Sequence, residues 1–91
     1  MKITAVCGTG LGSSFMLEMN VKKVLKELGI TAEVNHTDLA SVIEGEADFF
    51  IMSRDIAGSA NVSNKIVLAN IINVAEIKEA MVKAFQEKGI L

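Results

Sequence analysis

Residues 2–15 read KITAVCGTGLGSSF, an apolar run that leads directly into a loop containing three glycines and two serines. The run from residue 2 to residue 6 is short and apolar enough to predict a strand buried on both faces. A buried strand followed by a glycine-rich loop and a helical pattern is typical of parallel α/β proteins. We therefore expect this segment to organise the fold, with Cys7 at the carboxyl end of the first strand.

The rest of the chain alternates amphipathic and apolar segments. An apolar stripe at helical spacing predicts a helix that Ser13 or Ser14 caps and that runs to about Leu28. Gly29 is expected to be its left-handed stop. Three further strands are predicted, at 31–36, 47–52 and 65–69. A two-turn helix at 39–44 is capped by Asp38 and followed by Gly45, and one helical turn lies within 53–62. A last helix begins with a capping box at 73–76 and ends at Gly89.

This alternation of strands and helices predicts one α/β domain over residues 1–91. We expect a four-stranded parallel sheet in the order 2-1-3-4, flanked by helices on both faces. In such sheets ligands bind beyond the carboxyl ends of the strands, where the strand order reverses. Cys7 is predicted to lie at such a point.

Composition narrows the class of protein. The 91 residues carry a net charge of −2, and no basic run exceeds Lys22-Lys23, which argues against nucleic acid as a partner. The single cysteine has no partner for an internal disulfide. Neither a signal peptide nor an apolar stretch of ~20 residues is present, so we expect a cytoplasmic protein that reaches a membrane only through a partner.

The loop after the first strand has the properties of an anion site. Glycines at positions 8, 10 and 12 allow positive φ, so that successive backbone N–H groups can converge on one ligand. The start of the following helix adds further N–H groups and a partial positive charge. Hydroxyl donors are available from Thr9, Ser13 and Ser14. Phosphate is the expected ligand.

The partial positive charge at the start of this helix also acts on Cys7. We expect it to lower the pKa of the thiol below its ordinary value of about 8.5, so that the thiolate becomes the dominant form. A nucleophile beside an anion cradle implies a covalent thiophosphate. A nucleotide-binding P-loop fits less well, because the first lysine after the loop is Lys22, and the dinucleotide fingerprint requires glycine where Ser13 stands.

The segment CGTGLGSSFM, followed by an amphipathic helix containing methionines, resembles the IIB components of the bacterial sugar phosphotransferase system (PTS). The resemblance covers essentially the whole chain and is closest to the ascorbate type of the lactose/cellobiose-like group. It implies a phosphocysteine at Cys7, a phosphohistidine on a IIA protein as the donor, and a sugar held by the IIC membrane transporter as the acceptor. It implies no metal or organic cofactor. The phosphate loop maps onto Gly8, Thr9, Gly10, Leu11, Gly12, Ser13 and Ser14.

The fold that the resemblance implies is also that of low-molecular-weight tyrosine phosphatases, whose loop is Cys, five residues, Arg and Ser. Ser13 stands where the phosphatase has its arginine. Loss of a guanidinium that binds and activates phosphate favours a carrier, which needs a long-lived thiophosphate. Two alternatives stay open: a small cysteine phosphatase or arsenate reductase, and a non-catalytic domain that binds an anion.

Other residues near the predicted site have a functional and an ordinary interpretation. Arg54 and Asp55 follow the third strand and are candidates for an auxiliary role in the site. Arg54 would supply a positive charge, and Asp55 would orient a donor group. In the ordinary interpretation Arg54 is a surface residue and Asp55 caps a helix. His36 lacks a second ligand at metal spacing and is predicted to be an ordinary side chain at a strand end. Leu11, Phe15 and Met16 flank the loop and are predicted to form an apolar docking rim for IIA.

Overall fold

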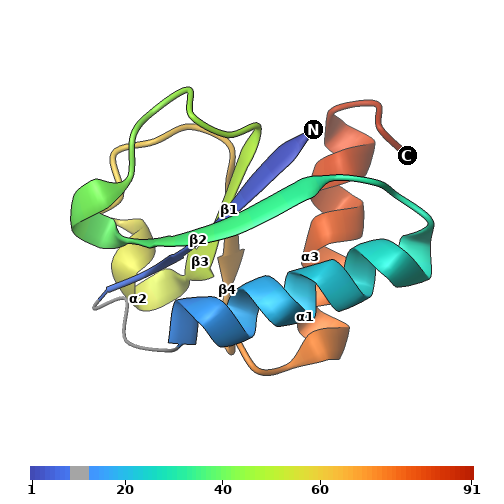
Figure 1. Ribbon diagram of the computed structural model, residues 1–91, viewed down its shortest axis with the longest axis horizontal. Coiled ribbons are helices and arrows are strands. Elements are labelled where there is room, and N and C mark those ends of the chain that lie inside the picture. Colours follow the sequence, from blue (N-terminus) through green and yellow to red (C-terminus); the bar gives the residue numbers. More distant parts are fainter. Residues whose placement is uncertain (9–12) are drawn as a thin grey trace.

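The computed structural model describes residues 1–8 and 13–91. Four parallel strands form one sheet in the order β2-β1-β3-β4, which confirms the predicted order (Figure 1). The strands are β1 (Lys2–Cys7), β2 (Glu33–Asp38), β3 (Phe49–Ser53) and β4 (Lys65–Leu68). The two most continuously buried strands, β1 and β3, occupy the centre, where both faces are covered.

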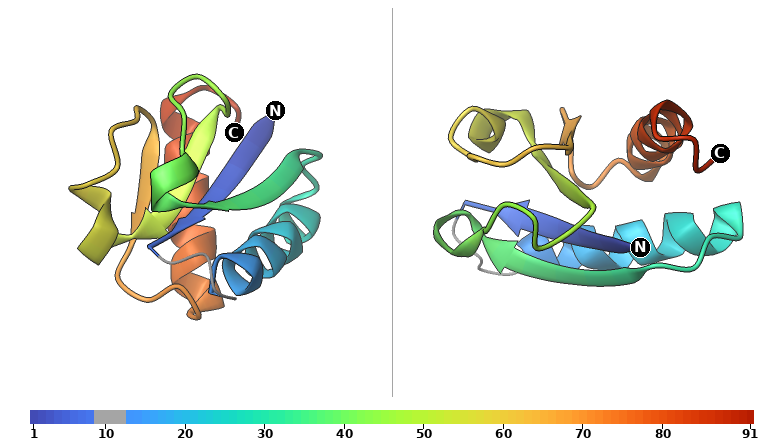
Figure 2. Two further views of the ribbon diagram at one scale, coloured as in Figure 1. Left: turned by 60° about the vertical axis from the view of Figure 1, so that its left-hand side comes forward. Right: turned by 90° about the horizontal axis from the view of Figure 1, so that it is seen from above.

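Helices cover both faces of the sheet. The long helices α1 (Ser13–Leu28) and α3 (Val74–Glu87) lie on one side, and the 3-10 helix η1 (Leu39–Ser41) and the single-turn helix α2 (Arg54–Ala57) lie on the other (Figure 2). The larger hydrophobic core lies beneath α1 and α3, where the rings of Phe49 and Phe85 meet edge to face with centroids 5.4 Å apart. The predicted apolar stripes supply this core: Leu17, Val21 and Val24 from α1, and Ile77 and Met81 from α3.

Left-handed glycines end both long helices, as predicted. Gly29 has φ +69° after α1, and Gly89 has φ +74° after α3. Neither conformation is favourable for a residue with a Cβ atom, so these positions select glycine. No helix within the described residues is long and apolar enough to cross a membrane.

Three predicted elements differ from the structure. The third strand begins at Phe49, two residues later than expected. The second strand begins and ends two residues later than expected, and the two-turn helix predicted at 39–44 is a single 3-10 turn. Asp38 caps that turn as predicted, accepting a hydrogen bond of 2.8 Å from Ser41 N. The turn stops because Val42 is extended and because the Glu44 carboxylate accepts hydrogen bonds from Ser63 N and Oγ, at 2.7 and 3.0 Å. Tertiary contacts therefore override a weak helical pattern.

The capping box of α3 forms only in part. Asn73 caps the helix through its Oδ1, which accepts from Glu76 N at 3.1 Å. The reciprocal bond from Asn73 N to the Glu76 carboxylate is replaced, because this carboxylate instead accepts from Ala69 N and Asn70 N. Glu76 thus ties the start of α3 to the end of β4.

Candidate active site

Cys7 ends the first strand of the sheet. It pairs in register with Asp38 of β2, and β3 flanks the other side of β1. The chain leaves β1 for an edge strand on one side and later returns to the other side, so Cys7 lies at the point where the strand order reverses. Strand alternation puts its side chain on the same face as Ile3 and Ala5, the face that α1 covers. The thiol is half-buried.

A cavity of about 390 Å³ opens beside Cys7. Its walls come from the carboxyl ends of three strands: β1, β3 and β4. The lining residues are Val6, Cys7, Gly8, Ser53, Asp55, Ile56, Ala69, Asn70 and Ile71. No lysine or arginine is among these described residues, so the walls provide a thiol, a carboxylate and an amide but no cation.

The structure separates the two auxiliary candidates that follow β3. Asp55 lines the cavity, and its carboxylate accepts a hydrogen bond from the Ser53 hydroxyl. Arg54 is exposed in the first turn of α2 and does not line the cavity. Of these two residues, only Asp55 lines the same cavity as Cys7.

Most of the predicted phosphate loop lies outside the described residues. This applies to Thr9, Gly10, Leu11, Gly12 and the side chain of Ser13. Gly8 lines the cavity and does not adopt the positive φ that glycine allows. Gly8 directly continues an extended strand, and a Cβ atom there would meet Ile56 Cγ2 at 3.5 Å, an ordinary contact. Neither its conformation nor its surroundings require glycine at position 8.

Ser14 does not cap α1. The helix begins at Ser13, so Ser14 lies inside the first turn, where its side chain is fully buried. Its hydroxyl has no hydrogen-bond partner among the described residues. Buried hydroxyls normally find a partner, and an unpaired one costs free energy. Ser14 is not among the described residues that line the Cys7 cavity.

Sequence analysis missed the third wall of the cavity. Ala69, Asn70 and Ile71 follow β4, which lies next to β3. A signal for them was available, because all strands of a parallel sheet present their carboxyl ends at one edge. The rule that places Arg54 and Asp55 at this edge also places the residues after β4 there.

His36 belongs to a different cluster. Its Nδ1 contacts the Glu18 carboxylate on α1, and its ring stacks on Phe15 with centroids 5.8 Å apart. Burial alone would raise the pKa of Glu18, but hydrogen bonds and charge from Lys22 and His36 outweigh it and lower the pKa below the ordinary 4.5. His36 therefore holds β2 to α1 and does not line the Cys7 cavity.

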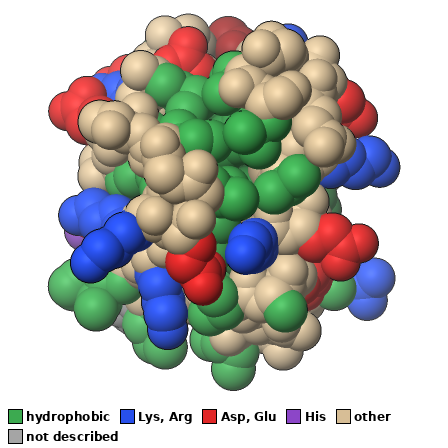
Figure 3. Space-filling view, turned by 90° about the vertical axis from the view of Figure 1, so that its right-hand side faces the viewer, with side chains coloured by type: hydrophobic (Ala, Val, Ile, Leu, Met, Phe, Trp, Pro, Cys, Tyr) green, Lys and Arg blue, Asp and Glu red, His purple; other side chains and the backbone are tan. Residues whose placement is uncertain are grey.

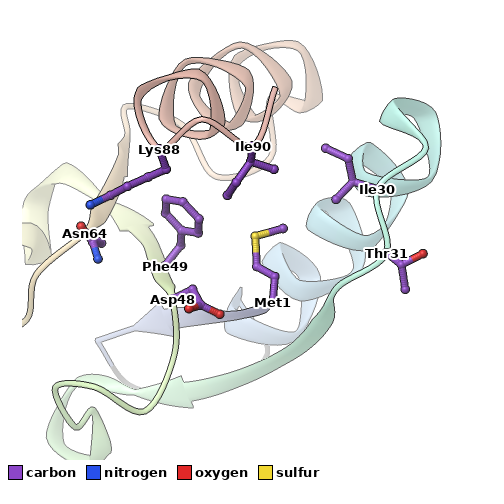
Figure 4. A pocket seen from close by; sticks show the side chains of 8 residues that line it. All are labelled: Met1, Ile30, Thr31, Asp48, Phe49, Asn64, Lys88 and Ile90. Atoms are coloured by element: carbon purple, nitrogen blue, oxygen red, sulfur yellow. The ribbon is translucent and has the colours of Figure 1, made fainter.

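A larger cavity, about 590 Å³, lies at the opposite edge of the sheet (Figure 4). Its lining combines apolar Met1, Ile30, Phe49 and Ile90 with polar Thr31, Asp48, Asn64 and Lys88. Hydrophobic side chains gather in the middle of the face formed by the right-hand side of Figure 1, with charged side chains around them (Figure 3). The lining of this cavity contains no cysteine or histidine, so the smaller cavity is the better candidate for chemistry.

Comparison with known proteins identifies the family. The family described as "PTS system, Lactose/Cellobiose specific IIB subunit" matches residues 2–88. The chain belongs to this family. It is thus a IIB phosphotransfer subunit of the PTS, as the loop sequence predicted.

Curated relatives support the same assignment over nearly their whole length. The "Ascorbate-specific PTS system EIIB component" of Mycoplasma pneumoniae is 33% identical, over 91% of this chain and 93% of the relative. The component of the same name from Escherichia coli O157:H7 is also 33% identical, over 96% of this chain and 91% of the relative.

The fold is shared with a phosphatase. A low molecular weight protein tyrosine phosphatase from Bacillus subtilis superimposes with a TM-score of 0.60 over 98% of this chain and 99% of that one, at 13% sequence identity. This confirms the predicted likeness of fold. At that identity it carries no argument about activity, and family membership favours the phosphotransfer subunit over the phosphatase.

Proposed function

We propose that this IIB subunit carries the phosphoryl group on Cys7, receiving it from a phosphohistidine of IIA and passing it to L-ascorbate held by IIC. The position of Cys7 at the carboxyl end of β1, in the wall of a cavity, carries the proposal. The family description names lactose and cellobiose, whereas the relatives that align over more than 90% of the chain are named ascorbate-specific, so ascorbate is the favoured sugar.

In the first step the Cys7 thiolate attacks the phosphorus of the phosphohistidine. A sulfur–phosphorus bond forms while the phosphorus–nitrogen bond breaks, and the leaving imidazole nitrogen keeps the electron pair. The thiolate supplies the electrons for the new bond, so no cofactor is needed. Such transfers depend mainly on positioning and on stabilisation of charge.

The phosphoryl group is then held by the segment from Gly8 to Ser14. Its backbone N–H groups and the first turn of α1 provide donors and a partial positive charge. Ser13 and Ser14 add hydroxyls. The buried, unpartnered hydroxyl of Ser14 supports this role, because a phosphoryl oxygen would supply the acceptor that the described residues do not.

In the second step a hydroxyl of the sugar attacks the phosphorus. An oxygen–phosphorus bond forms, the sulfur–phosphorus bond breaks, sulfur regains its electron pair as thiolate, and the hydroxyl proton passes to water. The lack of a cation among the described cavity residues suits a carrier, since hydrolysis is not promoted. Asp55 is suited to accept a hydrogen bond from the donor imidazole, and exposed Arg54 to contact an approaching partner.

Both partners would approach the edge of the sheet where the strands end. Phe15 and Met16, at the start of α1, expose 47% and 53% of their surface and form with Leu11 the proposed docking rim for IIA. We place the subunit in the cytoplasm, at the inner face of the membrane when bound to IIC.

Intact-protein mass spectrometry tests the carrier step. The protein is incubated with phosphoenolpyruvate, the general PTS proteins and a candidate IIA, beside a Cys7→Ser control. We expect a gain of ~80 Da, the mass of one phosphoryl group, in the parent and none in the control. The sugar is then identified with membrane vesicles that contain IIC. The phosphorylated subunit should transfer its phosphoryl group to L-ascorbate but not to lactose or cellobiose.

Two results would overturn the proposal. Release of phosphate from a small aryl phosphate, without labelling by any IIA, would favour a cysteine phosphatase. Anion binding that is equal in the parent and in Cys7→Ser, again without labelling, would favour a non-catalytic binding domain.

A further inference from the structure

Among the described residues that line the Cys7 cavity, Asn70 is the one with a side-chain amide. It follows β4 and lines the wall formed by the loop between β4 and α3. Its Oδ1 accepts a hydrogen bond of 3.0 Å from Ile72 N. Because a backbone N–H can only donate, the atom that faces it must be the amide oxygen, which fixes the orientation of the amide.

The amide nitrogen of Asn70 is therefore available to donate hydrogen bonds. Nδ2 carries two donors, and neither has a partner among the described residues. The two other polar side chains of the described lining, Cys7 apart, are already bonded to each other, since the Ser53 hydroxyl donates to Asp55. Asn70 Nδ2 is thus the donor that this wall offers to a ligand.

The loop that carries Asn70 is held firmly. The Glu76 carboxylate accepts from Ala69 N at 2.5 Å and from Asn70 N at 2.9 Å, so that each oxygen binds one loop N–H group. Asn73 N donates to Asn70 O at 3.2 Å, which closes the turn. Glu76 is fixed in turn by the first turn of α3, where Asn73 Oδ1 accepts from its backbone N–H.

We propose that Asn70 Nδ2 donates a hydrogen bond to the phosphoryl group on Cys7 and that Glu76 is the positioning residue that holds Asn70 in place. The inference rests on the proposed function and adds a contact from the loop between β4 and α3. A neutral donor suits a carrier, because it orients the phosphoryl oxygens without the full positive charge of a guanidinium.

The test substitutes Asn70→Asp, which has the same shape. The aspartate keeps Oδ1 as acceptor for Ile72 N, so the loop retains its bond, but it replaces the donor nitrogen with a charged acceptor. Asn64→Asp is the matched control, because it makes the same charge change at the opposite edge of the sheet, among the residues of the other cavity. The measurement is the rate of the ~80 Da gain at limiting phosphorylated IIA.

We expect Asn70→Asp to slow labelling by about tenfold or more, since a repelling oxygen replaces a donor to a charged group. Asn70→Ala should slow it less, and Asn64→Asp should match the parent. Circular dichroism provides the folded fraction for each rate. Parent-like labelling of folded Asn70→Asp would overturn the inference and leave the proposed function standing, whereas absent labelling of the parent would overturn both.

Glu76 is tested by a double-mutant cycle. Glu76→Gln leaves one loop N–H group without an acceptor and should slow labelling of the parent several-fold. If Glu76 acts through Asn70, the same substitution in the Asn70→Ala background should change the rate by less than twofold. Equal effects in both backgrounds would reduce Glu76 to a general structural role and remove it from the proposal.

Discussion

Ser14 places a hydroxyl inside the protein without giving it a partner among the described residues. A buried hydroxyl without a hydrogen bond costs about 1–3 kcal/mol. Serine is also a weaker helix former than alanine, and Ser14 lies within α1. Stability alone would therefore favour alanine at this position, which is the pattern expected where a residue serves a ligand.

Ser14→Ala should consequently raise the free energy of unfolding by about 1 kcal/mol and slow phosphorylation by IIA. Urea denaturation followed by circular dichroism measures the first effect, and the rate of the mass gain measures the second. A variant that is less stable than the parent would show that the hydroxyl is already satisfied in the unphosphorylated protein.

Among the secondary-structure elements, helix α1 and the edge strand β2 are joined by a cluster of charged and polar side chains. Glu18 on α1 has a side chain that is only 12% exposed, and its carboxylate meets both Lys22, at 2.7 Å, and His36 on β2. Burial acts to raise the pKa of Glu18, but hydrogen bonds and charge from Lys22 and His36 hold it below the ordinary 4.5. A lowered pKa in the folded protein means that the carboxylate stabilises the fold above pH 4.5 and loses that effect as the pH falls further.

Glu18→Gln should therefore lower the free energy of unfolding by about 1 kcal/mol at pH 7, and the difference from the parent should shrink as the pH falls below 4.5. Urea denaturation at several pH values checks this. Glu27→Gln, on an exposed position of the same helix, is the matched control and should differ little from the parent at any pH. A difference for Glu18→Gln that is constant with pH would contradict the charge-based account.

At the scale of the whole molecule, the two edges of the sheet differ in character. The carboxyl edge contains the Cys7 cavity, and the amino edge contains the larger cavity that both ends of the chain help to line. Exposed apolar side chains occur at both edges: Phe15 and Met16 start α1 near the first edge, and Ile90 lies at the second. Only the first group lies at the edge that contains Cys7, where the proposed exchange of a phosphoryl group would take place.

The double substitution Phe15→Ser and Met16→Ser should raise the KM for phosphorylated IIA about tenfold with little change in kcat, because apolar contacts with the partner are lost. Ile90→Ser removes a comparably exposed apolar group from the opposite edge and should leave both constants unchanged. Steady-state kinetics at varied IIA concentration separate the two constants. An equal effect of both changes would argue against a docking rim beside Cys7.

Local patterns in the sequence determined most of the fold. Alternation, caps and glycine stops act between neighbours along the chain, so β1, α1 with Gly29, α3 with Asn73 and the parallel order of strands were predictable. The lone cysteine after a buried strand likewise indicated the family and the candidate nucleophile. The lack of a positive φ at Gly8 and the shortened helix after Asp38 were not predictable, because packing and long-range hydrogen bonds decide them.

The walls of the cavity were decided only by the tertiary structure. Cys7, Asp55 and Asn70 lie far apart in sequence and meet because their strands end at one edge of the sheet. The sequence by itself determined most strands and helices and pointed to Cys7 as the candidate nucleophile, since these depend on local periodicity and residue chemistry. Folding alone decided that Asp55, and not Arg54, lines the site and that Glu76 binds the β4–α3 loop, because each of these depends on which side chains the closed sheet brings within contact.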